Sequence, residues 1–309
     1  MKEGISLFLK GVAMGAANVI PGVSGGTVAF ITGIYERLIQ AVKSVDLQAL
    51  KLLAKGQFAA FARQVDLGFL LWLGAGIVVS ILTLASVLKY LFANHEALVW
   101  AFFFGLILAS VYFVGKQVGR WTPGAVVGFV LGAGIAIGVA LLKPASENDN
   151  VWYLLLCGVI AMASMIIPGL SGSFVLLLLG NYQLIMIESV AGLKSLDADA
   201  FRILIPVGIG AVIGVILLSR LLAWIFAEYH DLAVALLTGF VAGSLLIIWP
   251  WKNAQIEVFE AAGKVKEKVV GYEWYFPELN GATWIALGVM AVGFVAVWAM
   301  EKSGAVKPE

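Results

Sequence analysis

Ile20-Pro21-Gly22-Val23-Ser24-Gly25-Gly26-Thr27 interrupts the first apolar segment of the chain, and Ile167-Pro168-Gly169-Leu170-Ser171-Gly172-Ser173 interrupts a later one. Proline removes a backbone hydrogen-bond donor and glycine loosens a helix, so such a break is costly inside hydrocarbon. Broken backbone at membrane depth is tolerated only where it is packed in protein or lines a wet cavity. These two stretches therefore decide the fold if the chain lies in a membrane.

Composition places the chain in a membrane. Of its 309 residues, 61% are hydrophobic and only 13% are charged, whereas about 25% of a typical soluble domain is charged. Several uncharged runs of roughly 20 residues are each long enough to cross a bilayer. The net charge of +1 argues against nucleic acid as a partner, and a single cysteine excludes a disulfide framework. The first apolar stretch is too long for a cleavable signal peptide.

The two breaks belong to an internal repeat. When the sequence is shifted by 147 positions, residues 11–35 fall on residues 158–182, and eleven of the 25 pairs are identical. A shift of 134 positions aligns the segments that follow, including Gly74 with Gly208, Gly76 with Gly210 and Gly105 with Gly239. Chance does not readily supply a shared Pro-Gly-x-Ser-Gly and a series of glycines in the same order, so we infer a duplication.

Each broken stretch has about 30 residues, and a straight helix of that length measures about 45 Å, too long for one crossing. We therefore predict an all-α polytopic membrane protein of two inverted repeats, each a re-entrant broken-helix hairpin followed by three transmembrane helices. Ten crossings, with the N-terminus outside, remain the alternative. The first repeat, 1–145, has a hairpin at 5–35, an amphipathic surface helix at 36–66 and spans at 69–92, 97–115 and 123–142. The second repeat, 150–309, has a hairpin at 152–182, spans at 203–227, 232–250 and 283–300, and a polar insert, roughly 252–280, expected as a loop or surface helix.

Charge sets the expected orientation. Five basic residues lie between positions 37 and 63, namely Arg37, Lys43, Lys51, Lys55 and Arg63. Cytoplasmic loops carry an excess of such residues. We therefore expect a multi-pass protein of the cytoplasmic membrane with its N-terminus in the cytoplasm.

The paired breaks predict an anion site. The second half of each hairpin would begin near Ser24 or Ser171, where free backbone N–H groups and hydroxyls meet the positive end of a helix dipole. A purely structural kink, with small residues for tight helix packing, is the alternative. No residue is assigned to catalysis or to a metal, and no cofactor is expected, although proton or sodium coupling is left open. The predicted substrate-binding residues are Asn18, Pro21, Gly22, Ser24, Gly25, Gly26, Thr27, Arg37, Pro168, Gly169, Ser171, Gly172 and Ser173.

These motifs resemble those of the PopT family of polyprenyl-phosphate transporters. The resemblance rests on Gly11-Val12-Ala13-Met14-Gly15, on residues 20–27 and 33–39, on residues 167–174 and 179–182, and on Trp249-Pro250-Trp251. It covers essentially the whole chain. It implies a flippase that returns undecaprenyl phosphate across the membrane, so that this lipid carrier is reused in peptidoglycan synthesis. The implied partner is the polyprenyl-phosphate lipid, and a homo-oligomer is left open.

Two other functions compete with this one. The first is a secondary transporter for a small soluble anion. The second is an enzyme like the undecaprenyl-pyrophosphate phosphatases, which would need an acid or base beside its serine. The first hairpin offers Asn18, Pro21 and glycines but no Glu or His, so we predict that the protein is not an enzyme.

Overall fold

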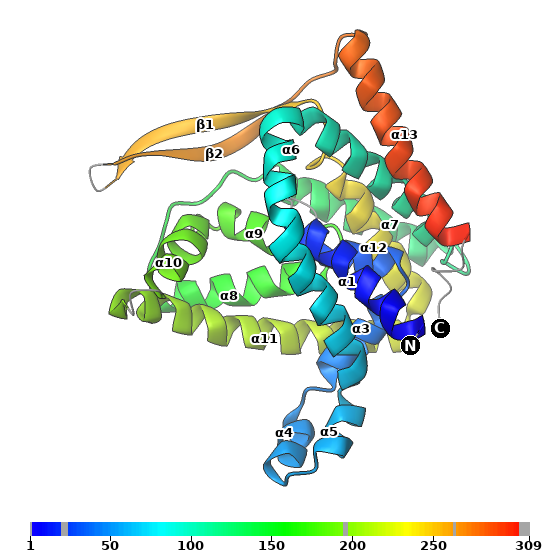
Figure 1. Cartoon of the computed structure of the whole chain (residues 1–309), viewed down its shortest axis with the longest axis vertical. Helices are drawn as coiled ribbons and strands as arrows, with labels where there is room; N and C mark the ends of the chain where they lie inside the picture. Colours follow the sequence, from blue (N-terminus) through cyan, green and yellow to red (C-terminus); the bar gives the residue numbers. More distant parts are fainter. Residues whose placement is uncertain (1, 20–23, 194–196, 262–263, 303–309) are drawn as a thin grey trace.

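The computed structural model describes residues 2–19, 24–193, 197–261 and 264–302, which form helices and one two-stranded sheet (Figure 1). The β-hairpin extends from the helical body at the top of the view, and a pair of short helices, α4 and α5, projects at the bottom. The elements are α1 (Lys2–Val19), α2 (Gly25–Ile31), α3 (Tyr35–Lys43), α4 (Leu47–Ala54), α5 (Phe58–Gln64), α6 (Leu67–Gly115), α7 (Pro123–Ala140), α8 (Val151–Ile166), α9 (Gly172–Leu178), the π-helix η1 (Gln183–Ser189), α10 (Val190–Gly192), α11 (Ala198–Glu228), α12 (His230–Ser244), β1 (Lys252–Ala261), β2 (Lys264–Trp274) and α13 (Gly281–Lys302).

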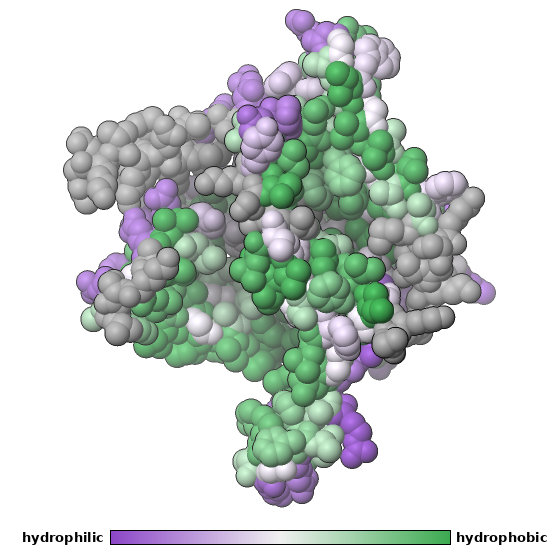
Figure 2. Space-filling view, in the orientation of Figure 1, coloured by the Kyte–Doolittle hydropathy of each residue, from purple (hydrophilic) through white to green (hydrophobic). Residues whose placement is uncertain are grey.

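Four of the described helices are long and apolar enough to cross a membrane: Tyr90–Gly115 within α6, all of α7, all of α11, and Gly281–Ala299 within α13. Two more pairs of helices, each bent sharply at a short break, raise this number to six if each pair counts as one span. Apolar side chains cover much of the surface over these helices (Figure 2). The chain thus has the helices of a multi-pass membrane protein, as its composition predicts.

The second Pro-Gly stretch interrupts a helical segment, as predicted, because it separates α8 from α9. Pro21 and Gly22 of the first stretch lie outside the described residues, which resume at Ser24, before α2. Ile167 has an extended backbone with ψ of 120°, the conformation favoured before a proline. Gly169 has φ of +86°, which glycine adopts at little cost.

The predicted spans 69–92 and 97–115 both lie within α6, which consists of two helices joined at a kink. At His95, between the two, φ is −143° and ψ is 41°, outside the helical region. The chain thus breaks its helical path between these spans, although the connecting residues include no proline or glycine. The other four predicted spans lie on α7, α11, α12 and α13, although the helix α12 ends at Ser244, before the predicted end at 250.

Where one surface helix was predicted over 36–66, the chain forms three short helices, α3, α4 and α5. Asp46 starts α4, because its carboxylate accepts hydrogen bonds from the N–H groups of Gln48 and Ala49. Gly56, with φ of +69°, follows the end of α4. Leu47, Leu50 and Phe58 of this segment are exposed, so an apolar surface is present although the helix is divided.

The prediction of a loop or helix for the insert 252–280 is wrong, because β1 and β2 occupy most of it. They pair antiparallel from Lys252 opposite Trp274 to Ala261 opposite Lys264, with an irregularity between Gln255 and Ile256. Within the insert, Ala254-Gln255-Ile256-Glu257-Val258 alternates apolar and polar residues, which is the period of a strand and not of a helix.

Glycines bring the long helices into close contact. A Cβ atom at Gly11 of α1 would overlap the carbonyl oxygen of Leu73 in α6, and one at Gly158 of α8 would overlap that of Val207 in α11. In the same way, Gly132 of α7 meets the backbone of α12, and Gly293 of α13 meets that of α6. Without a hydrophobic effect between helices in lipid, such close backbone packing is a main source of association.

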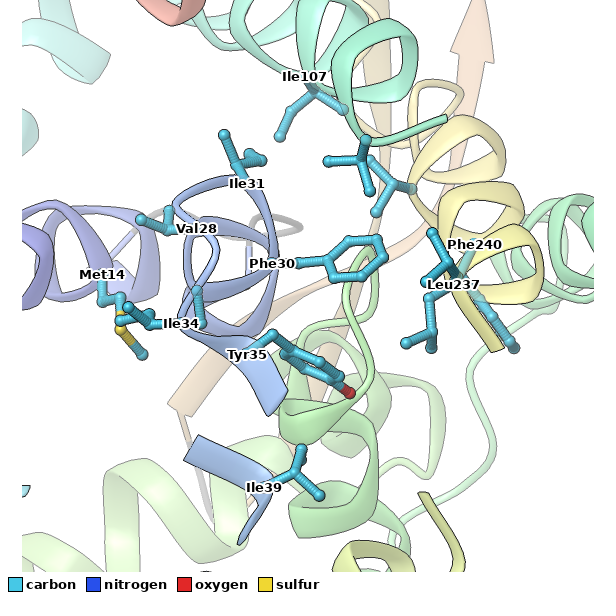
Figure 3. Close-up of a cluster of buried hydrophobic side chains, with 14 of the residues drawn as sticks. Met14, Val28, Phe30, Ile31, Ile34, Tyr35, Ile39, Ile107, Leu237 and Phe240 are labelled. Carbon is cyan, nitrogen blue, oxygen red and sulfur yellow. The ribbon is translucent and has the colours of Figure 1, made fainter. Parts of the chain in front are cut away.

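The largest buried cluster joins the first hairpin to α12. Figure 3 shows Phe30 of α2 directed toward Leu237 and Phe240 of α12, with Tyr35 beside it. The rings of Phe30 and Tyr35 meet edge to face, with their centroids 5.3 Å apart. This packing fixes α2 against the second half of the chain, next to the break between α8 and α9.

Candidate functional site

A cleft of about 270 Å³ lies where the two broken segments meet. Its polar lining comes from both of them: Asn18 and Ser24 from the first, and Ser171 and Ser173 from the second. Ser24 and Ser171 are buried, with 2% and 7% of their surfaces exposed. The rest of the lining is small or apolar and is formed by α8, α9, η1 and α11.

The first hairpin presents its polar groups already hydrogen-bonded. Asn18 Oδ1 accepts from the N–H of Gly25 at 2.8 Å, and Ser24 Oγ accepts from the N–H of Gly26 at 3.1 Å. Ser24 Oγ also donates to the carbonyl oxygen of Met165, 3.1 Å away on the other hairpin. The amide NH₂ of Asn18 is the donor that remains for a ligand on this side.

The second hairpin is arranged differently. Ser171 stands at the start of α9 but makes no capping hydrogen bond with its side chain. Its hydroxyl instead pairs with that of Ser173 at 2.8 Å. Two hydroxyls that bond each other can turn toward an incoming anion without breaking a helix cap. The second hairpin is therefore the better donor of hydrogen bonds to a ligand.

Two more hydrogen bonds hold the hairpins together behind the cleft. The N–H of Gly169 donates to Thr27 Oγ1 at 2.8 Å, and the Tyr35 hydroxyl donates to the carbonyl oxygen of Ile166 at 3.1 Å. These are backbone groups left without a helical partner by the break, and buried groups of that kind need one. Thr27 therefore supports the second hairpin and does not line the cleft.

The structure brings together five of the thirteen predicted residues: Asn18, Ser24, Ser171, Gly172 and Ser173 line the cleft. Gly25 and Gly26 lie directly behind Asn18 and Ser24, and Pro168 and Gly169 are buried. Pro21 and Gly22 lie outside the described residues.

Arg37 is not brought to the cleft. Its guanidinium lies 2.9 Å from the carboxylate of Glu3 and 2.7 Å from that of Asp66, and it covers the ring of Phe69. These contacts link the first turn of α1 to the residue that precedes α6. In this arrangement the charge of Arg37 is already compensated by two carboxylates.

The apolar wall of the cleft was not among the predicted site residues. Gly158, Ala161, Met162 and Met165 recur along one face of α8, at the spacing of a helix. This spacing is visible in the sequence and leads directly to the Pro-Gly break, so it could have indicated that this face of α8 lines the site. Ile185 and Met186 of η1 and Val207 and Ala211 of α11 also line the cleft, but no local signal connects them to it.

The described lining contains no Lys, Arg, His, Asp or Glu. The cleft thus offers hydroxyl and amide groups, without a compensating charge or a general acid or base. Such a lining can hold an anion through hydrogen bonds, but it holds no group suited to phosphoryl chemistry.

Comparison with known proteins agrees with the motifs. Residues 14–266 match the model of a family described as VCA0040-like, undecaprenyl phosphate translocase-like. The chain is 35% identical over 303 residues to a polyprenyl-phosphate transporter of Vibrio cholerae serotype O1, covering 96% of each protein. It is 28% identical over 256 residues to a polyprenyl-phosphate transporter of Staphylococcus aureus, covering 78% of this chain and 85% of that one. No solved structure matches the chain significantly.

Proposed function

The chain belongs to the undecaprenyl phosphate translocase-like family, and we propose that it carries undecaprenyl phosphate across the cytoplasmic membrane. It acts as a transporter and not as an enzyme. The observation that carries this proposal is the cleft, in which polar side chains from two distant Pro-Gly stretches converge inside an apolar, helical body.

The phosphate head binds at the serine end of the cleft. Ser171 and Ser173 donate hydroxyl hydrogen bonds to its oxygens, and the amide of Asn18 donates from the opposite hairpin. Ser24 and Gly172 shape the same end. Because Gly25, Gly26, Thr27, Pro168 and Gly169 lie behind the cleft, their role is to hold the two breaks in position.

The two halves are inverted repeats, and their broken segments re-enter the membrane. The glycine contacts support the repeat itself, and the odd number of three spans predicted for each half supports the inversion. Gly11 meets Leu73 and Gly158 meets Val207; a shift of 147 relates the two glycines and a shift of 134 relates the two partners, as in the sequence alignment. Phe8 and Gly76 correspond in the same way to Leu155 and Gly210.

The third helix of each half packs on the other half, since α7 lies against α12 and α13 lies against α6. Movement of one half relative to the other would then open the cleft to each side in turn, as in other transporters built from inverted repeats. The basic residues of α3 to α5 favour a cytoplasmic position for that end of the molecule, together with the start of α1.

The proposal is tested with purified protein in liposomes that contain labelled undecaprenyl phosphate. Wild-type protein should accelerate the exchange of head groups between leaflets, and it should release no inorganic phosphate from undecaprenyl pyrophosphate. Uptake of free phosphate without lipid exchange would identify a soluble-anion transporter instead, and phosphate release would identify an enzyme.

A further inference from the structure

The cleft has an apolar end that the phosphate head does not explain. It reaches the surface at Met165 and Met186, with 43% and 45% of their surfaces exposed, while Ser24 and Ser171 lie buried at its depth. Met162 and Ile185 extend the same wall. The cleft thus has two buried serines at its depth, whereas its exposed lining includes Met165, Met186 and Asn18.

This opening faces the lipid and not an aqueous compartment. Ile187, which follows Met186 in η1, and Val190, which follows η1, are also apolar and exposed. Together with α9, η1 forms a bent pair that counts as one candidate membrane span. Exposed apolar side chains of such a span face hydrocarbon, so a chain that leaves the cleft beside Met186 enters the bilayer directly.

Met186 is held by an irregular element. Ile185 and Met186 belong to η1, a seven-residue π-helix that turns by 114° relative to α9. π-helical segments are rare and occur frequently at functional sites. Here the irregular winding brings two consecutive residues, Ile185 and Met186, to the cleft.

We propose that Met165 and Met186 form the lateral portal through which the isoprenoid chain of the bound lipid leaves the cleft for the bilayer. This inference rests on the proposed function. The cleft has room for a phosphate and the first part of a chain, so the remainder has to pass its rim. Methionine suits that rim, because its unbranched thioether adapts to an irregular apolar ligand such as a methyl-branched polyprenyl chain.

The test compares two adjacent residues of η1. Met186→Trp fills the rim, whereas Ile187→Trp places the same ring on an exposed residue that does not line the cleft. We expect Met186→Trp to slow exchange of undecaprenyl phosphate by at least about tenfold, because the larger ring would fill the rim through which the chain passes. Ile187→Trp should exchange the lipid at nearly the wild-type rate.

Binding of dimethylallyl phosphate, which is too short to reach the rim, separates the portal from the head-group site. Met186→Trp should bind it like the wild type. Lipid exchange by Met186→Trp at the wild-type rate would overturn the portal. Loss of dimethylallyl phosphate binding together with lipid exchange would also overturn it. If the wild-type protein exchanges no lipid at all, the proposed function fails instead.

A second measurement does not depend on the folding of a variant. Undecaprenyl phosphate with a diazirine on its first isoprene unit is photolysed with wild-type protein, and the labelled peptides are identified. The portal predicts labelling within residues 158–166 and 183–189. Labelling confined to other helices would overturn it.

Discussion

Thr27 Oγ1 accepts a hydrogen bond from the backbone N–H of Gly169, 2.8 Å away, and so joins the two broken segments. The two residues are 142 positions apart, and both are buried. The relationship is not symmetric, because the residue that corresponds to Thr27 in the second segment is Phe174. The first segment therefore supports the second, and the serines of the second are left to face the cleft.

Thr27→Val should destabilise the protein without adding bulk. Valine has nearly the same shape but cannot accept a hydrogen bond, so the buried N–H of Gly169 would lose its partner at a cost of about 1–3 kcal/mol. Unfolding in detergent measures the change, with Thr27→Ser, which keeps the acceptor, as the control. Equal stability of the valine variant and the wild type would show that this hydrogen bond does not hold the hairpins together.

Gly169→Ala should be more damaging than an alanine elsewhere. The backbone of Gly169 has φ of +86°, and a Cβ atom there would lie 2.6 Å from the carbonyl oxygen of Phe240. The left-handed conformation alone costs a side-chain-bearing residue about 1–2 kcal/mol. Gly208→Ala, within α11 and with open space around it, is the matched control and should leave stability unchanged or raise it. Similar effects at the two sites would contradict the described break.

Asn18→Asp separates binding from folding. Aspartate still accepts the hydrogen bond of the Gly25 N–H, so stability should be retained. Its charge should repel a phosphate in the cleft and slow lipid exchange by at least about tenfold, since like charges near 4 Å repel by about 4 kcal/mol at an effective dielectric constant of about 20. Asn150→Asp is the control, because Asn150 also accepts a hydrogen bond at a helix start, from Trp152, but lies outside the cleft. Lipid exchange by Asn18→Asp at the wild-type rate would show that the phosphate head group does not bind at this end of the cleft.

Asp46 should make the order of α4 depend on pH. Hydrogen bonds from the N–H groups of Ala49 and Gln48 hold the pKa of its carboxyl below the ordinary value of 3.8. A lowered pKa in the folded state means that the stabilisation is present at neutral pH and is lost as the pH falls through that lowered pKa. Hydrogen exchange of residues 47–54 should thus be faster in Asp46→Ala than in wild type at pH 7, and the difference should vanish in acid. A difference that persists in acid would assign the effect to packing.

The sequence predicted the parts of the structure that depend on local chemistry. Proline and glycine in the two repeated stretches predicted where the helices break, and the repeat predicted that Ser24 and Ser171 would meet. It did not predict which hydroxyls are free. Thr27 and Arg37 have suitable chemistry for a phosphate, but their partners are Gly169 in one case and Glu3 and Asp66 in the other. Whether a polar side chain can bind a ligand therefore depends on which protein groups it already contacts in the folded structure.

The part of the apolar wall formed by η1 and α11 was beyond the reach of sequence for a similar reason. Met186 and Val207 approach the cleft from two elements whose relative position depends on the bend at η1. The β-hairpin, in contrast, could have been recognised in part, because Ala254-Gln255-Ile256-Glu257-Val258 alternates apolar and polar residues like a strand.

The most direct measurement follows the head group of labelled undecaprenyl phosphate in liposomes, with wild-type protein and with the Ser24→Ala/Ser171→Ala double variant, after both are shown to be folded. Wild-type protein should accelerate the rate at which the label becomes protected from an external reagent, and the double variant should not. Equal acceleration by both proteins would contradict the phosphate site in this cleft. No acceleration by the wild type, with or without a proton or sodium gradient, would contradict the transport of this lipid.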